Sequence, residues 1–115
     1  MPMTILDQRF YNVWYVGEIN EDCVDRIIEC LVNYSSKAIG RVRLRFYLKN
    51  IQDLSYIAYV RRILLQNTSL SIVIEEKLVE DLERDIKSAE DEIVVIKNRG
   101  GLEIPLSEKI KIVEV

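Results

Sequence analysis

The chain is predicted to fold as a single α/β domain, with a mostly parallel or mixed β-sheet, three helices mainly on one face and a β-rich C-terminal tail. Three observations predict this class. Its 115 residues suffice for one hydrophobic core and are too few for two. Apolar residues make up 49% of the chain and charged residues 30%, as in ordinary globular proteins. Stretches with strand periodicity alternate with stretches of helix periodicity, which indicates parallel strands joined by crossovers.

The expected elements follow one another without a linker, a repeat or a low-complexity segment across residues 1–115. In chain order they are short strands over 4–6 and 12–17, a helix that follows Asn20, a strand within 40–50, a helix over 51–66, a strand over 70–74, a helix over 77–90, a strand over 93–96, a hairpin partner over 102–104 and a final strand over 109–115. The tail, residues 98–115, is therefore a β-hairpin and terminal-strand extension of the same domain.

The helices are predicted from caps and from apolar spacing. Asn20 is a good N-cap because its side-chain oxygen can accept from the free amides of the first turn, and Asn50 stands at the same place before the second helix. Apolar residues then recur at three- and four-residue spacing, which gives each helix one apolar face. In the first helix these residues are Cys23, Val24, Ile27, Ile28, Leu31 and Val32.

The strands are predicted from apolar runs and from alternation. Residues 12–17 are an apolar run closed by Gly17, and residues 93–96 are a second such run. Asn98-Arg-Gly-Gly101 has the composition of a hairpin turn. Pro105 ends the run that follows, and the last seven residues, KIKIVEV, have the pattern of a final strand.

Charge is segregated along the chain, whose formal net charge is −3. Residues 1–36 hold two bases and six acids, residues 37–66 seven bases and one acid, and residues 67–115 seven bases and twelve acids. A basic middle therefore lies between acidic flanks. This asymmetry fits a binding surface, and it fits equally charge complementarity within one fold.

Several kinds of chemistry are excluded by composition. The chain has no histidine, so Ser-His-Asp and Cys-His arrangements cannot form, and a Cys/His metal site is not expected. There is no glycine-rich phosphate loop. Cys23 and Cys30 lie about 10.5 Å apart along a helix, farther than the roughly 7 Å that a disulfide spans. We expect no catalytic residues, no metal and no cofactor, and therefore no enzyme.

One group of basic residues is the candidate binding site. Alternation places Arg41, Arg43 and Arg45 on one face of their strand, together with Tyr47 and, if the strand extends that far, Lys49. The following helix adds Arg61 and Arg62. Such a set can contact phosphates, it can bind a protein or a second copy of the chain, and it can simply be a solvated face paired with acidic residues of the same chain.

The final strand offers a second interaction surface. If residues 109–115 form an edge strand, their open hydrogen-bonding groups can pair with a second copy to give a homodimer. The alternative is an antiparallel partner within the same sheet. No apolar run approaches the roughly 20 residues of a membrane span, and no signal-peptide pattern is present, so the expected location is cytoplasmic, without membrane contact.

The layout of residues 4–97 resembles STAS domains, the anti-sigma-factor-antagonist family. That family opens with two short strands and a Gly-Glu-Leu-Asp-like turn, which here is Gly17-Glu-Ile-Asn20. Its Asp-Ser-Ser-Gly-Leu segment, with a serine phosphorylated by a partner kinase, corresponds to Asp53-Leu-Ser-Tyr-Ile57. The resemblance implies a non-enzymatic protein-interaction module with Asp53 and Ser55 as candidate regulatory residues, although Leu54 stands at the usual phosphorylated position.

A weaker resemblance is to Alba-like chromatin proteins, which share a strand-helix-strand-helix-strand order and would imply nucleic-acid binding by the basic strand over residues 41–49. Their Gly-Lys-Lys-Pro stretch would fall at Gly17-Glu-Ile-Asn20, where glutamate replaces lysine. The leading expectation is therefore an interaction module of STAS-like type, with nucleic-acid binding as the alternative.

Overall fold

Five strands and three helices follow one another in the part of the chain that the structure describes. The structure, a computed structural model, describes residues 10–37, 41–48, 54–67, 71–98, 104 and 107–115. The elements are β1 (Phe10–Val16), α1 (Val24–Ser35), β2 (Arg41–Leu48), α2 (Leu54–Asn67), β3 (Ser71–Leu78), the 3-10 turn η2 (Val79–Asp81), α3 (Leu82–Ser88), β4 (Ile93–Lys97) and β5 (Ile110–Glu114).

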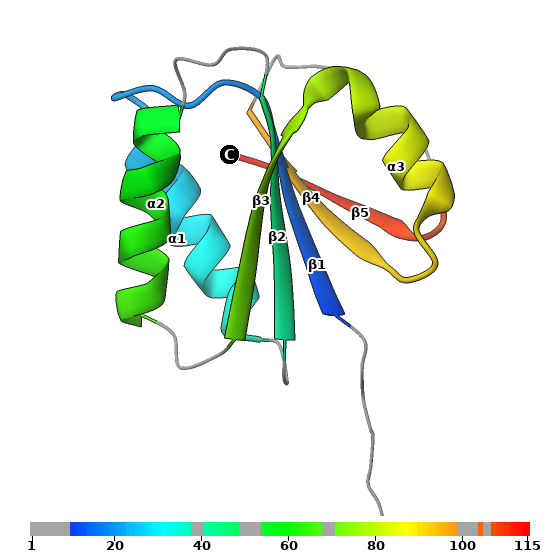
Figure 1. The fold of residues 1–115 in the computed structure, drawn as a ribbon, viewed down its shortest axis with the longest axis horizontal. Coiled ribbons are helices and arrows are strands. Elements are labelled where there is room, and N and C mark those ends of the chain that lie inside the picture. Colours follow the sequence, from blue (N-terminus) through cyan, green and yellow to red (C-terminus); the bar gives the residue numbers. More distant parts are fainter. Residues whose placement is uncertain (1–9, 38–40, 49–53, 68–70, 99–103, 105–106) are drawn as a thin grey trace, which may run out of the picture.

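All five strands form one sheet in the order β3-β2-β1-β4-β5, and every neighbouring pair is parallel. Crossovers between parallel strands are right-handed in nearly all proteins. Because the chain first moves towards β3 and then returns towards β5, α1 and α2 lie over one face of the sheet and α3 over the other (Figure 1). The predicted α/β class with a parallel sheet, and with helices mainly on one face, is confirmed.

The entry into α1 shows how the local sequence sets an element. Asn20 Oδ1 accepts from the amides of Asp22 at 3.0 Å and of Cys23 at 3.2 Å, so the predicted capping residue shapes the turn that leads into the helix. The helix itself begins at Val24. Cys23 is buried, Cys30 is half-buried, and both thiols are free, as the spacing predicts.

The face of α1 and α2 holds the larger hydrophobic core. The inward residues of β2, which are Val42, Leu44 and Phe46, are fully buried there. The same cluster receives one apolar side of each helix and alternate residues of β1. Its helical members are Val24, Ile27, Ile28 and Leu31 from α1 and Ile57, Val60 and Leu64 from α2.

The opposite face has a smaller apolar cluster because a single seven-residue helix covers it. Trp14 and Val16 of β1, Tyr47 of β2 and Ile93 and Val95 of β4 contribute from the sheet. Leu82 and Ile86 pack on them from α3, and the buried Ile104 joins them from the connection between β4 and β5.

Two sequence-based boundaries were wrong. The strand expected over 70–74 runs on as β3 to Leu78, and the helix expected over 77–90 is reduced to η2 and the seven residues of α3. The pairing of β3 with β2 continues through Lys77, which is registered with Tyr47. This pairing outweighs the helix-like spacing of the apolar residues, so the segment stays a strand.

The remaining expected elements are the short strand over 4–6, the hairpin partner over 102–104 and the final strand. The short strand over 4–6 and most of the hairpin partner over 102–104 lie outside the described residues, and the described Ile104 is not in a strand. The final strand is present as β5, at an edge of the sheet and parallel to β4. None of the helices in the described part of the chain has the length and apolar character of a membrane span.

Candidate functional site

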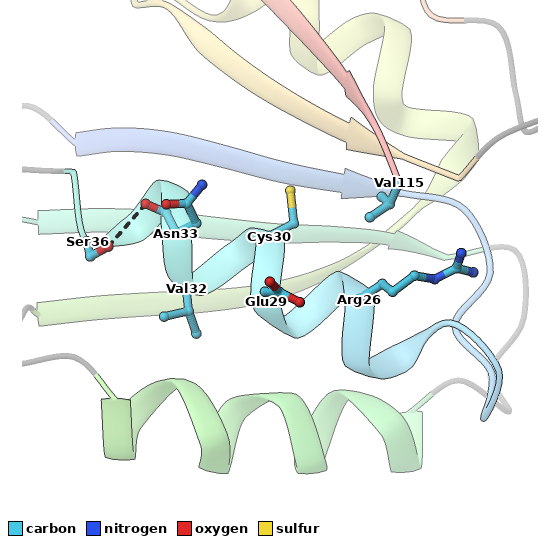
Figure 2. Close-up of a pocket in the computed structure, with 7 residues that line it drawn as sticks. All are labelled: Arg26, Glu29, Cys30, Val32, Asn33, Ser36 and Val115. Carbon is cyan, nitrogen blue, oxygen red and sulfur yellow. Dashed lines mark hydrogen bonds between the residues drawn. The ribbon is translucent and has the colours of Figure 1, made fainter.

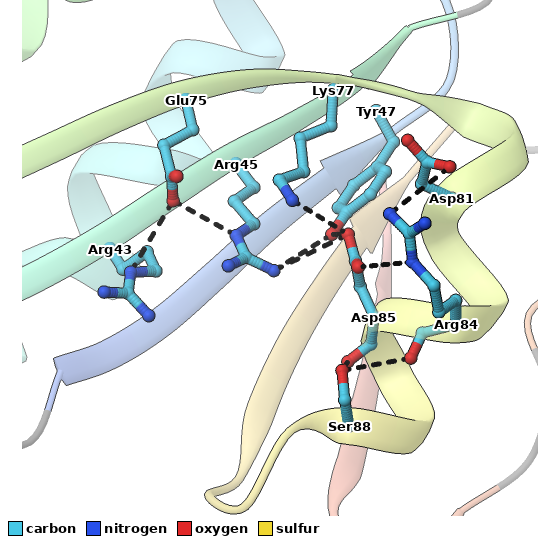
Figure 3. A network of polar contacts seen from close by, with 9 residues as sticks. All are labelled: Arg43, Arg45, Tyr47, Glu75, Lys77, Asp81, Arg84, Asp85 and Ser88. Carbon is cyan, nitrogen blue, oxygen red and sulfur yellow. Dashed lines mark hydrogen bonds and ion pairs between the residues drawn. The ribbon is translucent and has the colours of Figure 1, made fainter.

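The basic strand is β2, and its two faces point to different helical layers of the fold. Its apolar residues face α1 and α2, whereas Arg43, Arg45 and Tyr47 extend over the α3 face, where they reach β3 and α3 (Figure 3). Arg41 has the same parity as these residues and is exposed. The predicted alternation is therefore real, and it separates the core from an ionic surface.

The other predicted site residues do not join the basic strand. Arg61 and Arg62 are exposed on α2, a helix that covers the opposite face of the sheet. Ser55 is exposed in the first turn of α2. Lys49 and Asp53 lie outside the described residues.

Glu75 of β3 is the first acidic partner of the arginines. Its Oε1 lies 3.2 Å from Arg45 Nε and 3.6 Å from Arg43 Nε. Parallel register makes this possible, because Glu75 is paired with Arg45 on the neighbouring strand. Arg45 also lies with its guanidinium carbon 4.8 Å from the ring centroid of Trp14, so it stacks on an aromatic face.

Asp85 of α3 is the second acidic partner and connects that helix to the sheet. Its Oδ2 accepts a 2.7 Å hydrogen bond from the Tyr47 hydroxyl and a 3.2 Å bond from Lys77 Nζ. Arg45 Nη1 lies 3.7 Å from the same oxygen and donates a 3.2 Å bond to the Tyr47 hydroxyl. On the outer side, Arg84 Nε lies 3.6 Å from Asp85 Oδ1.

Burial and charge act against each other on these groups. Burial tends to raise the pKa of Asp85, but the hydrogen bonds from Tyr47 and Lys77 and the nearby cations outweigh it, so the pKa lies below its usual value. The pKa of Tyr47 is raised far above its usual value, chiefly by burial and then by the bond to Asp85. At neutral pH the network thus holds an ionised carboxylate and a neutral phenol.

The sequence left open that the arginines pair with acidic residues of the same chain, and the structure shows such pairing with Glu75 and Asp85, but the sequence did not identify these two residues. Glu75 and Lys77 stand at alternate positions of β3 and face the arginines across the strand register. The same period-two signal that placed the arginines therefore continues through β3, whereas the strand was expected to end at residue 74 and a helix to begin at residue 77. Asp85 comes from a different layer, and no local pattern marks it.

We define the basic sheet surface as the described charged residues on the α3 face of β2 and β3 together with Asp85. It holds four cations, Arg41, Arg43, Arg45 and Lys77, against two anions, Glu75 and Asp85. The side chains of Arg43 and Glu75 are 36% and 37% exposed, and Val73 beside them is 40% exposed. The surface is accessible, and it carries a net charge of +2 if all six groups are ionised.

The carboxyl ends of β1 and β4 are where an open parallel sheet usually binds a ligand, because the strand order reverses there. Here the chain itself occupies that place. Asn98 Nδ2 donates a 2.9 Å bond to the carbonyl of Glu18, and the Tyr15 hydroxyl donates a 2.7 Å bond to the same oxygen. Gly17 has a φ of 135°, and a Cβ there would lie 3.3 Å from the Tyr15 hydroxyl. These bonds fix the loop instead of leaving donors for a ligand.

A groove of about 600 Å³ runs along α1 to Val115 (Figure 2). Its lining is mixed: one cation and one anion, Arg26 and Glu29, accompany a half-buried thiol, an amide, a hydroxyl and two valines. The opposite charges of Arg26 and Glu29 give no preference for a charged ligand. The described residues contain no group of three Cys, Asp or Glu that could hold a metal ion.

The basic sheet surface is thus the most distinctive polar arrangement in the described chain. Comparison with protein-family models, with curated proteins and with solved structures found no match. The resemblances to STAS domains and to Alba-like proteins remain predictions.

Proposed function

We propose that the protein is a non-enzymatic protein-interaction module of STAS-like type, and that its basic sheet surface binds an acidic segment of a partner protein. The observation that carries this proposal is the accessible excess of cations over anions on the α3 face. Arg41 and Arg43 lie towards the amino ends of the strands, away from Asp85. An acidic segment would add its carboxylates at that end, where arginine can bind them bidentately.

The chemistry of the network supports binding over catalysis. Tyr47 is fully buried and its raised pKa makes it a poor proton donor. Asp85 is 8% exposed, and its lowered pKa together with three bonded cations makes it a poor general base. Groups that are paired in this way orient one another and hold α3 on the sheet.

Nucleic-acid binding is the second candidate, because the same excess of positive charge attracts phosphates. Two features favour a protein. Glu75 lies among the arginines and would face the phosphates, and the exposed apolar side chain of Val73 borders the patch. A protein segment can place a carboxylate on Arg43 and an apolar residue on Val73.

A titration with two probes tests the proposal. The probes are a fluorescent ten-residue peptide of alternating glutamate and valine, and a fluorescent single-stranded oligonucleotide of equal charge. We expect the peptide to bind, and Arg43→Glu to weaken its binding by about tenfold or more. The matched control is Arg62→Glu, which makes the same charge change on α2, and we expect it to change binding less than about twofold.

Equal losses for the two variants would show attraction by net charge alone and would refute a site on the α3 face. Tighter binding of the oligonucleotide than of the peptide, with an affinity that falls linearly with salt on logarithmic axes, would establish the nucleic-acid candidate instead. Absence of peptide binding at about 50 mM salt would overturn the proposal.

A further inference from the structure

The two edges of the sheet differ in length and in exposed apolar surface. β3 has eight residues, all registered with β2 on its inner side, and its outer side has no strand partner in the described part of the chain. β5, at the other edge, has five residues. An edge strand with open amides and carbonyls is a template for pairing with another strand.

β3 carries more of the exposed large apolar side chains than β5 does. The large apolar residues that are exposed in the described structure are five, and four of them belong to α2 and β3: Tyr59, Leu65, Val73 and Leu78. Leu78, at 61%, is the most exposed of them. The fifth, Ile112, is 38% exposed and lies on β5. β3 is therefore the edge at which added contact would cover more apolar surface.

We propose that β3 is a self-association edge, at which residues 74–78 of two copies of the chain pair antiparallel around a two-fold axis at Glu76. In this register Glu75 stands opposite Lys77 of the second copy, and Lys77 stands opposite its Glu75. Ile74 stands opposite Leu78 of the second copy, which places the exposed leucine in an apolar pair. Opposite residues point to the same side of the joined sheet, so each pairing is consistent with the alternation of β3.

The order of charges in β3 is what selects a second copy as the occupant. Glu75 and Lys77 stand one residue before and one residue after Glu76. A two-fold axis at Glu76 therefore places the negative charge of each copy opposite the positive charge of the other. Both residues already belong to the ionic network, and the contact would extend that network across the interface (Figure 3).

The β5 edge lacks this complementarity. A two-fold axis at Ile112 would place Lys111 opposite Val113 and Glu114 opposite Ile110, so neither charge would meet an opposite charge. We therefore propose β3 as the homodimer contact, in place of the final strand over residues 109–115.

One pair in the proposed register is unfavourable, and it provides a test. Glu76, which is itself exposed, would stand opposite Glu76 of the second copy on the side of β3 that belongs to the α1 and α2 face. Like charges directly opposite each other weaken a strand pair. The register therefore predicts a dimer that becomes tighter when this one charge is removed.

Sedimentation over a range of protein concentrations tests the inference with the full chain. We expect a concentration-dependent dimer, whose dissociation constant rises at least about tenfold in Leu78→Lys. Glu76→Gln should lower the constant by about two- to fivefold. The matched control Ile112→Lys, at the exposed apolar residue of β5, should change it less than about twofold.

Three outcomes would overturn the β3 contact: a protein that stays monomeric at all concentrations, a dimer that Ile112→Lys disrupts and Leu78→Lys does not, or an unchanged dimer in Glu76→Gln. Leu78 and Ile112 are both exposed, so both lysine variants are expected to fold, and circular dichroism of each variant verifies this.

Discussion

The two faces of β2 belong to one strand and are stabilised in different ways. Towards α1 and α2, the strand buries Leu44 and Phe46 among apolar side chains from two helices. Towards α3, the alternate residues Arg43 and Arg45 meet carboxylates instead. The difference follows from the amount of cover, because a seven-residue helix cannot exclude water from the whole face. Arginine suits such a half-covered position, since its stem packs while its head stays hydrated or paired.

The two faces of the sheet also have different roles: one contributes most to the free energy of unfolding, and the other fixes the position of α3. Apolar burial contributes about 25 cal/mol per Å², whereas a buried ion pair returns little beyond the cost of removing its charges from water. We therefore expect the α1 and α2 face to supply most of the free energy of unfolding. The ionic face fixes where α3 sits, because only one placement of Asp85 meets both Tyr47 and Lys77.

The largest expected effect is on the apolar face. Phe46→Ala removes a fully buried ring that packs against Tyr15 at a centroid distance of 6.1 Å. The lost transfer free energy and the remaining cavity should lower the free energy of unfolding by about 3–5 kcal/mol. Urea denaturation followed by circular dichroism measures the change. A loss under about 1 kcal/mol would show that the apolar core is not the main source of stability.

A smaller loss is expected on the ionic face. Asp85→Ala leaves Tyr47, Lys77 and Arg45 without the acceptor that they share, so we expect a loss of about 2 kcal/mol, reduced from that of a fully buried pair because Lys77 is partly exposed. The matched control is Asp81→Ala. Asp81 pairs with the exposed Arg84, and its removal should cost less than about 1 kcal/mol. Equal effects of the two variants would contradict a special role of Asp85.

Acid pH should weaken the same contact. The pKa of Asp85 lies below its ordinary value of 3.8, so between these two values the unfolded chain binds more protons than the folded one. The contribution of Asp85 is therefore complete above pH 3.8 and is lost as the pH falls through the lower folded value. Denaturation of the wild type and of Asp85→Asn between about pH 2 and pH 7 measures this, and the stability difference should narrow at the acid end. A difference that is independent of pH would contradict the ionised state of Asp85.

The fold could be predicted from the sequence wherever the local signals and the sheet pairing favour the same element. The apolar spacing of α1 acts within a few residues, and this prediction was confirmed. Asn20 does accept from two amides of the preceding turn, but Cys23 and not Asn20 is the N-cap residue of α1. The end of β3 was not predicted, because Lys77 and Leu78 follow a pairing with β2 that is set by contacts 30 residues away in the chain. The local spacing in this stretch fits both a strand and a helix, and pairing with the neighbouring strand decides where β3 ends.

For the same reason, only part of the candidate site could be predicted from the sequence. Alternation alone placed Arg43 and Arg45 on one face, since side chains of a strand point to alternate sides. Their partners required the strand order and the position of α3, which bring Glu75 and Asp85 to the same arginine. Arg61 and Arg62 were grouped with the strand by proximity in sequence, yet the crossover carries α2 to the other face.

The smallest expected effect concerns the accessible end of the basic sheet surface. Arg43 is 36% exposed and lies 3.6 Å from Glu75, which Arg45 approaches more closely at 3.2 Å. Arg43→Ala should therefore lower the free energy of unfolding by less than about 1 kcal/mol, and this loss should shrink further at about 1 M salt, where the Debye length is about 3 Å. Urea denaturation at low and high salt measures both quantities. A salt-independent loss of about 2 kcal/mol or more would mean that Arg43 supports the fold of the α3 face, and its place in a binding surface would have to be reconsidered.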